Sequence, residues 1–136
     1  MGLHDGDSWR IDVLTIYRKR YLLIVHEKTL YTFLLKSPEV KTIKELIKQI
    51  REKCSWYDYD PKNLFVGKGN NRKVTGSITD MMKLIKFWQW DNLSIEAMLK
   101  QINDTPFSML GFNDPFLAVT IYMKEKAGHN QPLKRL

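Results

Sequence analysis

The sequence has a single cysteine, Cys54, among its 136 residues, which excludes a fold held together by intrachain disulfides. The three histidines are far apart, so no spacing typical of a zinc site occurs, and we predict neither a metal nor another cofactor. The longest purely apolar run, Tyr21–Val25, is too short to cross a bilayer, and the polar start MGLHDGDSWR lacks the apolar segment of a secretory signal. These absences predict a cytoplasmic protein without membrane contact.

Acidic residues are also in the minority. Fifteen Asp and Glu face 22 Lys and Arg, which gives a net charge of +7 and predicts attraction to anionic partners such as nucleic acid. Hydrophobic residues make up 43% of the chain, enough for the core of one globular domain. We expect a single domain over residues 1–136, with flexible tails at 1–8 and 125–136.

Three β-rich runs follow one another near the N-terminus. Apolar and polar residues alternate from Ile11 to Arg18, and the runs Tyr21–His26 and Leu30–Leu35 follow after short connections. This arrangement predicts an antiparallel meander. The run FLAVTIYM, Phe116–Met123, is also rich in β-formers and is predicted to join the sheet, while Leu64–Val66 is either a short strand or an anchor.

Helical patterns lie between these runs. The capping box Thr42–Glu45 opens a helix whose apolar stripe continues to Cys54. Ser77 or Thr79 is expected to cap a second helix that ends at Trp90, and Ser94 a third that ends before Thr105–Pro106. The sequence therefore predicts an α+β fold: a small, mostly antiparallel sheet, made of the meander and a C-terminal strand, with three helices packed mainly on one face.

The stretch GKGNNRKVTGSITD, residues 67–80, is the main candidate for a ligand site. Its glycines allow backbone amides to approach a ligand, its cations suit phosphate, and a helix is expected to begin within it. The spacing matches neither a Walker A loop nor a dinucleotide fingerprint, and a simple turn followed by a helix cap is the alternative. The predicted ligand-binding residues are Lys68, Asn71, Arg72, Lys73, Gly76, Ser77, Arg18 and Arg20.

These cations, together with nearby aromatic residues, favour a non-enzymatic protein that binds nucleic acid or another phosphate-bearing ligand. The interpretation requires that the Arg18–Arg20 turn and the cations near Arg72 lie on one surface. No helix-turn-helix, KH or zinc-finger pattern accompanies them.

Two other function classes remain open. A protein-interaction or inhibitory accessory protein of a phage or mobile element would use an aromatic helix surface, or self-association, through Trp88 and Trp90. A small nuclease or toxin would use His26 and Glu27, together with Arg72, although a histidine that ends a strand is more often simply hydrogen-bonded. A row of cations at Lys41, Lys44, Lys48 and Arg51 is either a solvated helix face or a further contact surface.

Two stretches together resemble a known family. Trp9–Leu34, WRIDVLTIYRKRYLLIVHEKTLYTFL, is similar to the start of an uncharacterised bacterial domain-of-unknown-function family of small proteins. Asn71–Met82, NRKVTGSITDMM, resembles its second motif, in which an arginine is followed by Gly-Ser and then by an aspartate. The resemblance implies a shared fold unit and no known activity.

Overall fold

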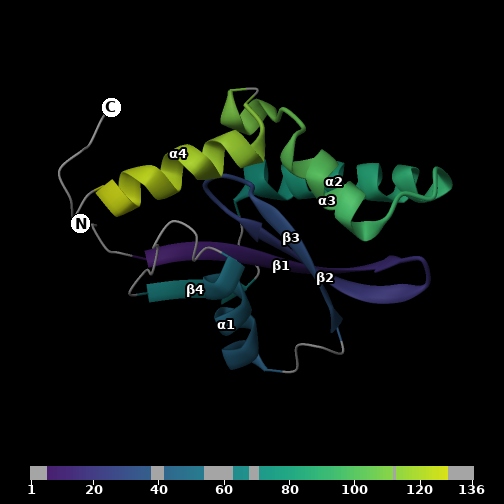
Figure 1. Cartoon of the computed structure of the whole chain (residues 1–136), viewed down its shortest axis with the longest axis horizontal. Coiled ribbons are helices and arrows are strands. Elements are labelled where there is room, and N and C mark those ends of the chain that lie inside the picture. Colours follow the sequence, from purple (N-terminus) through teal and green to yellow (C-terminus); the bar gives the residue numbers. More distant parts are fainter. Residues whose placement is uncertain (1–5, 38–41, 54–62, 68–70, 112, 129–136) are drawn as a thin grey trace.

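The computed structural model describes residues 6–37, 42–53, 63–67, 71–111 and 113–128, and it has the predicted α+β class (Figure 1). The described elements follow in the order β1 (Gly6–Ile16), β2 (Lys19–His26), β3 (Thr32–Lys36), α1 (Ile43–Lys53), β4 (Asn63–Gly67), α2 (Arg72–Trp90), α3 (Ile95–Asn103), the short 3-10 helix η3 (Ser108–Leu110) and α4 (Pro115–Gly128). None of the helices in these ranges has the length and apolar composition needed to span a bilayer.

The described strands form one sheet in the order β3-β2-β1-β4. β1 pairs with β2 and β2 with β3 in antiparallel fashion, which confirms the predicted meander. β4 runs parallel to β1, from the pair Gly6↔Asn63 to the pair Arg10↔Gly67, so the stretch around Leu64–Val66 is a strand. The sheet is therefore mixed and mostly antiparallel.

The connection between β1 and β2 is a two-residue hairpin turn. Ile16 pairs with Lys19, and the residues between them, Tyr17 and Arg18, have φ values of 52° and 67°. Such left-handed pairs match the twist of a hairpin, but Asn-Gly is the usual choice, because a side chain in this conformation costs about 1 kcal/mol. This hairpin therefore presents a tyrosine and an arginine at an energetic cost.

The two faces of the sheet carry separate cores, because successive strand residues point to opposite sides. Leu23 and Val25 pack with residues of α2 and α3, whereas Ile24 packs with residues of α1 and α4. Figure 1 shows α1 on one side of the sheet, with α2 and α3 on the other. The first core includes Val74, Ile78, Met81, Ile85, Met98 and Ile102, and the second includes Trp9, Phe33, Leu46, Ile50, Val119 and Met123.

The predicted strand Phe116–Met123 is wrong, because these residues lie within α4. Asp114 precedes the helix and its Oδ1 accepts a hydrogen bond from the amide of Leu117 at 2.8 Å, while Pro115 occupies the first helical position. These are start signals of a helix, and they outweigh the β-branched residues of the run. The fourth strand of the sheet is β4 instead.

The prediction of three helices mainly on one face is also wrong, since the described residues form four α-helices that belong to both cores. The α1 capping box is confirmed: the Glu45 amide donates to Thr42 Oγ1 at 3.1 Å. α1 is described to Lys53, so Cys54 lies outside the described residues. The predicted tails overlap β1 at residues 6–8 and α4 at residues 125–128.

The start of α2 differs from the prediction of a cap at Ser77 or Thr79. α2 begins at Arg72, and Asn71 caps it by accepting from the amides of Lys73 and Val74 at 2.9 and 3.3 Å. The Ser77 and Thr79 hydroxyls lie inside the helix and donate to carbonyls four residues earlier. Both residues can bond within a helix as well as cap one, so the cap that comes first along the chain sets the boundary.

Replacing Asn71 with alanine should lower the free energy of unfolding by about 1 kcal/mol, because two amides of the first turn lose their acceptor. Urea denaturation followed by circular dichroism measures the change. Asn71→Asp keeps the acceptor oxygen and should stay within a few tenths of a kcal/mol of the wild type. Equal losses in both variants would contradict the capping role.

A buried asparagine joins α3 to the outer strand β3. Asn103 Oδ1 accepts from the Thr32 amide at 3.0 Å, and its Nδ2 donates to the Thr32 carbonyl at 2.9 Å. The side-chain amide thus forms the pair of bonds that a neighbouring strand would form. β3 is at the edge of the sheet formed by the described strands, so this contact satisfies backbone groups that none of those strands reaches.

Candidate functional site

The predicted ligand residues around the start of α2 divide into two groups. Asn71 is the helix cap, and its oxygen already accepts two of the amides that an anion would need. Arg72 and Lys73 are exposed in the first turn, whereas Lys68 lies outside the described residues. Residues 72–77 are helical, which corrects the prediction of a loop up to Ser77. An anion at this end would therefore contact side chains rather than a cradle of glycine amides.

Lys73, Gly76 and Ser77 nevertheless line one groove. It lies between the first half of α2 and η3 and has a volume of about 620 Å³. The other lining residues in the described part of the chain are Thr79, Asp80, Ser108 and Met109. Three of the eight predicted ligand residues are thus brought together, along with four that sequence reasoning did not single out for binding.

Arg18 and Arg20 lie far from this groove. The Tyr17 amide donates to Gln89 Oε1 at 3.1 Å and the Tyr17 hydroxyl donates to the Leu93 carbonyl at 2.6 Å, so the hairpin tip contacts the end of α2. At 1.5 Å per residue, the 19 residues of α2 separate the two cationic groups by about 27 Å. The predicted cations therefore mark opposite ends of α2 and do not form one cluster.

A ridge of exposed residues connects these two ends along the outward face of α2. Spacings of three and four residues put its members on one side of the helix. We call this set the α2 ridge: Arg72, Gly76, Thr79, Lys83, Lys86 and Trp90, all of them exposed. Lys83 and Lys86 were not predicted as site residues, although their spacing from Arg72 was visible in the sequence.

Large aromatic side chains stand exposed at the C-terminal end of this ridge. Trp90 is 82% exposed and Phe87 63%, and Tyr17, which contacts Gln89 and Leu93 at this end of α2, is 39% exposed. Trp88, in contrast, is 9% exposed and belongs to the core. Only one of the two tryptophans proposed for a protein surface is therefore available. We call the exposed aromatic residues and cations of the hairpin tip and the end of α2 the hairpin platform: Tyr17, Phe87, Trp90, Arg18, Lys19, Arg20 and Lys86.

The sequence matches the family described as Domain of unknown function (DUF6933) over residues 4–57 and 58–118. The chain belongs to the DUF6933 family. Both stretches that carried the resemblance, Trp9–Leu34 and Asn71–Met82, lie within the match, so the predicted membership is confirmed. No curated protein matches the sequence.

His26, the weak catalytic candidate, is fully buried in this DUF6933 fold. Its Nδ1 lies 2.8 Å from Thr29 Oγ1, and its ring packs between Trp9 and Tyr122 at centroid distances of 4.7 and 4.9 Å. The neighbouring Glu27 is half-buried, and its amide donates to the Ser8 carbonyl at 3.0 Å.

The sheet separates His26 from the start of α2. Trp9 and Arg10 are consecutive in β1 and point to opposite faces. Trp9 packs against His26 with the two rings tilted by 51°, whereas Arg10 Nη2 donates to Thr75 Oγ1 in α2 at 3.0 Å. His26 and Arg72 therefore belong to opposite faces, and they form no combined site.

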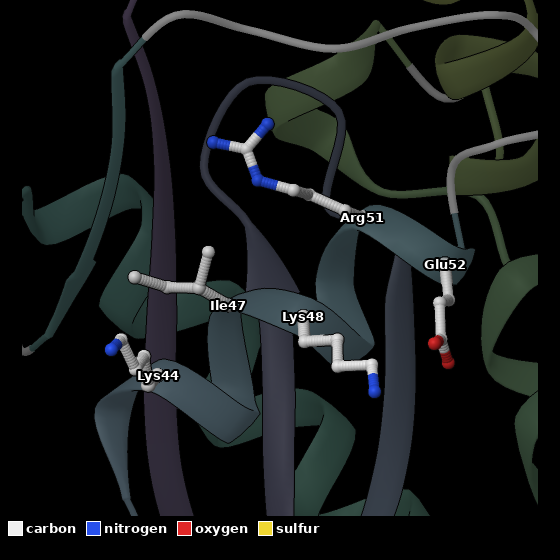
Figure 2. A pocket seen from close by; sticks show the side chains of 5 residues that line it. All are labelled: Lys44, Ile47, Lys48, Arg51 and Glu52. Atoms are coloured by element: carbon white, nitrogen blue, oxygen red, sulfur yellow. The ribbon is translucent and has the colours of Figure 1, made fainter.

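A second hollow lies on the outer side of α1 (Figure 2). Its volume is about 410 Å³, and the lining side chains among the described residues come from this one helix: Lys44, Ile47, Lys48, Arg51 and Glu52. Three of these residues belong to the predicted row of cations, whose fourth member, Lys41, is outside the described residues. Among the described residues only one helix lines this hollow, whereas two elements line the groove beside α2, which is therefore the better-defined candidate.

Proposed function

We propose that the protein binds single-stranded nucleic acid on the hairpin platform and along the α2 ridge. The observation that carries this proposal is the exposure of Trp90 and Phe87 at the end of α2 that the Tyr17 hairpin tip contacts, a tip that also carries the exposed cations Arg18, Lys19 and Arg20. Stacking surfaces next to cations are the combination that single-strand-binding proteins use. The net charge of +7 adds long-range attraction to any polyanion.

Cations and rings would have different roles in this contact. Arg18, Lys19 and Arg20 would neutralise phosphates, and Lys83 and Lys86 would extend the contact toward Arg72. Each neutralised phosphate releases counterions, which makes the affinity salt-dependent. Asp91, next to Trp90, is the exposed acidic residue closest in sequence to the rings, and it limits how strongly phosphates are attracted there.

Exposed rings favour a single strand over a duplex. The bases of a duplex are already stacked on one another, so their faces are closed to a protein ring. Unpaired bases have free faces, and each base stacked on an aromatic side chain contributes about 1–3 kcal/mol. Trp90 and Phe87 would therefore contribute more binding free energy with a single strand than with a duplex.

The backbone of the hairpin tip supports the same proposal. Tyr17 and Arg18 both adopt left-handed conformations, which asparagine and glycine adopt at lower cost. Residues that retain such strain cluster at functional sites. Tyr17 and Arg18 are kept at this tip despite their cost in stability, which supports a role for the two side chains in binding.

Trp90→Ala should weaken binding of a fluorescently labelled single-stranded oligonucleotide at least fivefold, because one stacking surface worth about 1 kcal/mol or more is lost. Fluorescence anisotropy across a series of salt concentrations provides the measurement. Arg18→Gln with Arg20→Gln should also reduce the slope of log affinity against log salt by about 0.7 for each phosphate contact removed.

Ile121→Ala is the matched control, because Ile121 is 47% exposed on α4 and lies outside the platform. Its affinity should equal that of the wild type. Binding that is absent at low salt, or that Trp90→Ala leaves unchanged, would refute the proposal. A duplex that binds more tightly than either of its strands would refute the preference for single strands.

An interaction with another protein is the second candidate, since a tryptophan exposed to 82% also suits a protein interface. It includes the case of an accessory protein of a phage or mobile element. Salt distinguishes the two candidates, because a hydrophobic interface persists at salt concentrations that release nucleic acid. Light scattering at high salt would detect self-association, and Trp90→Ala should abolish it.

A further inference from the structure

Gly76 is an unusual choice of residue for its position. It lies within α2, where glycine is less favourable than alanine. A Cβ added at Gly76 would have no atom within 4 Å, so nothing in the described structure requires glycine. Glycine also serves where a ligand approaches the backbone closely. Gly76 lines the groove between α2 and η3, which is the place for such an approach.

The groove has opposite charges at its two ends. Lys73 and Asp80 are seven residues apart, so they share one side of α2 with about 10 Å between them along the axis. Gly76 and Ser77 lie between them, and their small side chains leave space for a ligand in the middle of the groove. The volume of about 620 Å³ falls within the range of small-molecule sites. An elongated ligand would place an anionic group at Lys73 and hydrogen-bond donors at Asp80.

The middle of the groove offers mainly acceptors. The Ser77 hydroxyl donates to the Lys73 carbonyl at 3.0 Å, and the Thr79 hydroxyl donates to the Thr75 carbonyl at 2.9 Å. Each of these oxygens has used its one proton and retains acceptor capacity. An ionised Asp80 also only accepts. The ligand must therefore bring several donors of its own, as the hydroxyl groups of a sugar do.

We propose that this groove binds a phosphate monoester of a polyhydroxylated compound, with the phosphate at Lys73 and the hydroxyls at Asp80, Ser77 and Thr79. Sugar phosphates and nucleoside monophosphates share this chemistry. Met109 forms an apolar part of the groove on the η3 side and suits the base of a nucleotide. The groove lies about 21 Å along α2 from Trp90 of the hairpin platform, although it shares Gly76 and Thr79 with the α2 ridge.

The test is calorimetric titration of the full chain with ribose 5-phosphate, ribose and adenosine monophosphate. Ribose 5-phosphate should bind more tightly than ribose, and Lys73→Met should remove this difference. Asp80→Asn should weaken both. A higher affinity for adenosine monophosphate than for ribose 5-phosphate would identify a nucleotide site, and equal affinities a sugar-phosphate site. Absence of binding by both phosphates at millimolar concentration would overturn the proposal.

Gly76→Ala separates binding from folding. It should raise the denaturant midpoint, because alanine is the better helix former, and at the same time weaken ribose 5-phosphate binding at least tenfold. If Gly76→Ala still binds because a methyl group is too small to fill the groove, the larger side chain of Gly76→Leu should abolish binding in a protein that still folds. Gln101→Ala, at an exposed position of α3 away from the groove, should leave the affinity unchanged. Undiminished affinity in Gly76→Leu would exclude the groove.

Discussion

Replacing Asn103 with leucine should lower the free energy of unfolding by about 3 kcal/mol. Leucine has a similar size, but it leaves both the amide and the carbonyl of Thr32 without the partners that lie 3.0 and 2.9 Å away. Asn103 and Thr32 are both buried, so water cannot replace these bonds without opening the contact. Each unsatisfied buried group costs about 1–3 kcal/mol. Equilibrium urea denaturation measures the loss.

Gln101→Leu is the matched control for this experiment. Gln101 is exposed on the same helix, and its replacement should change the stability by less than about 0.5 kcal/mol. Amide hydrogen exchange adds a local test, because the Thr32 amide should lose protection first in Asn103→Leu. Equal stability of the two variants would show that the contact between α3 and β3 contributes little.

The opposite sign is expected at Arg10, where methionine should raise the free energy of unfolding by about 2 kcal/mol. Arg10 is 6% exposed, and its Nε and Nη1 have no hydrogen-bond partner among the described residues. A buried charge with unsatisfied donors is costly, and an apolar side chain of similar length removes that cost. The bond from Nη2 to Thr75 is lost, which offsets about 1 kcal/mol of the gain.

Arg20→Met provides the comparison for this substitution. Arg20 is exposed on β2, so the same chemical change there should alter the stability by less than about 0.5 kcal/mol. Asp12, two residues after Arg10 on the same strand, has a buried Oδ2 that also lacks a partner among the described residues. The two side chains therefore do not satisfy each other. A lower stability of Arg10→Met would mean that the guanidinium is satisfied in solution.

The meander and α1 were predictable because their signals are local. Alternation and short connections fixed β1 to β3, and Thr42 with Glu45 fixed the start of α1. The run Phe116–Met123 misled because its residues are typical of strands, while the decisive signal, Asp114 followed by Pro115, lies just before it. Helix start signals near a β-rich run therefore deserve more weight than the composition of the run.

The candidate site was predictable only in part. Lys73, Gly76 and Ser77 were predicted as ligand residues and line the groove, but its second wall, Ser108 and Met109, comes from a segment about 30 residues later. The contact of Tyr17 with Gln89 and Leu93 also depends on tertiary packing, which no local pattern encodes. The α2 ridge, in contrast, could have been found from helical spacing alone. It was missed because the helix was expected to begin at Ser77 or later, whereas α2 begins at Arg72.

The parallel pairing of β4 with β1 has a consequence for synthesis of the chain. β3 ends at Lys36, whereas β4 is complete only at Gly67, about 30 residues later. At translation rates of about 5–20 residues per second, the outer edge of β1 waits about 2–6 s for its partner. During that interval the nascent chain exposes a strand that can pair with other chains on the same messenger, so slow translation between these two points would favour aggregation over folding.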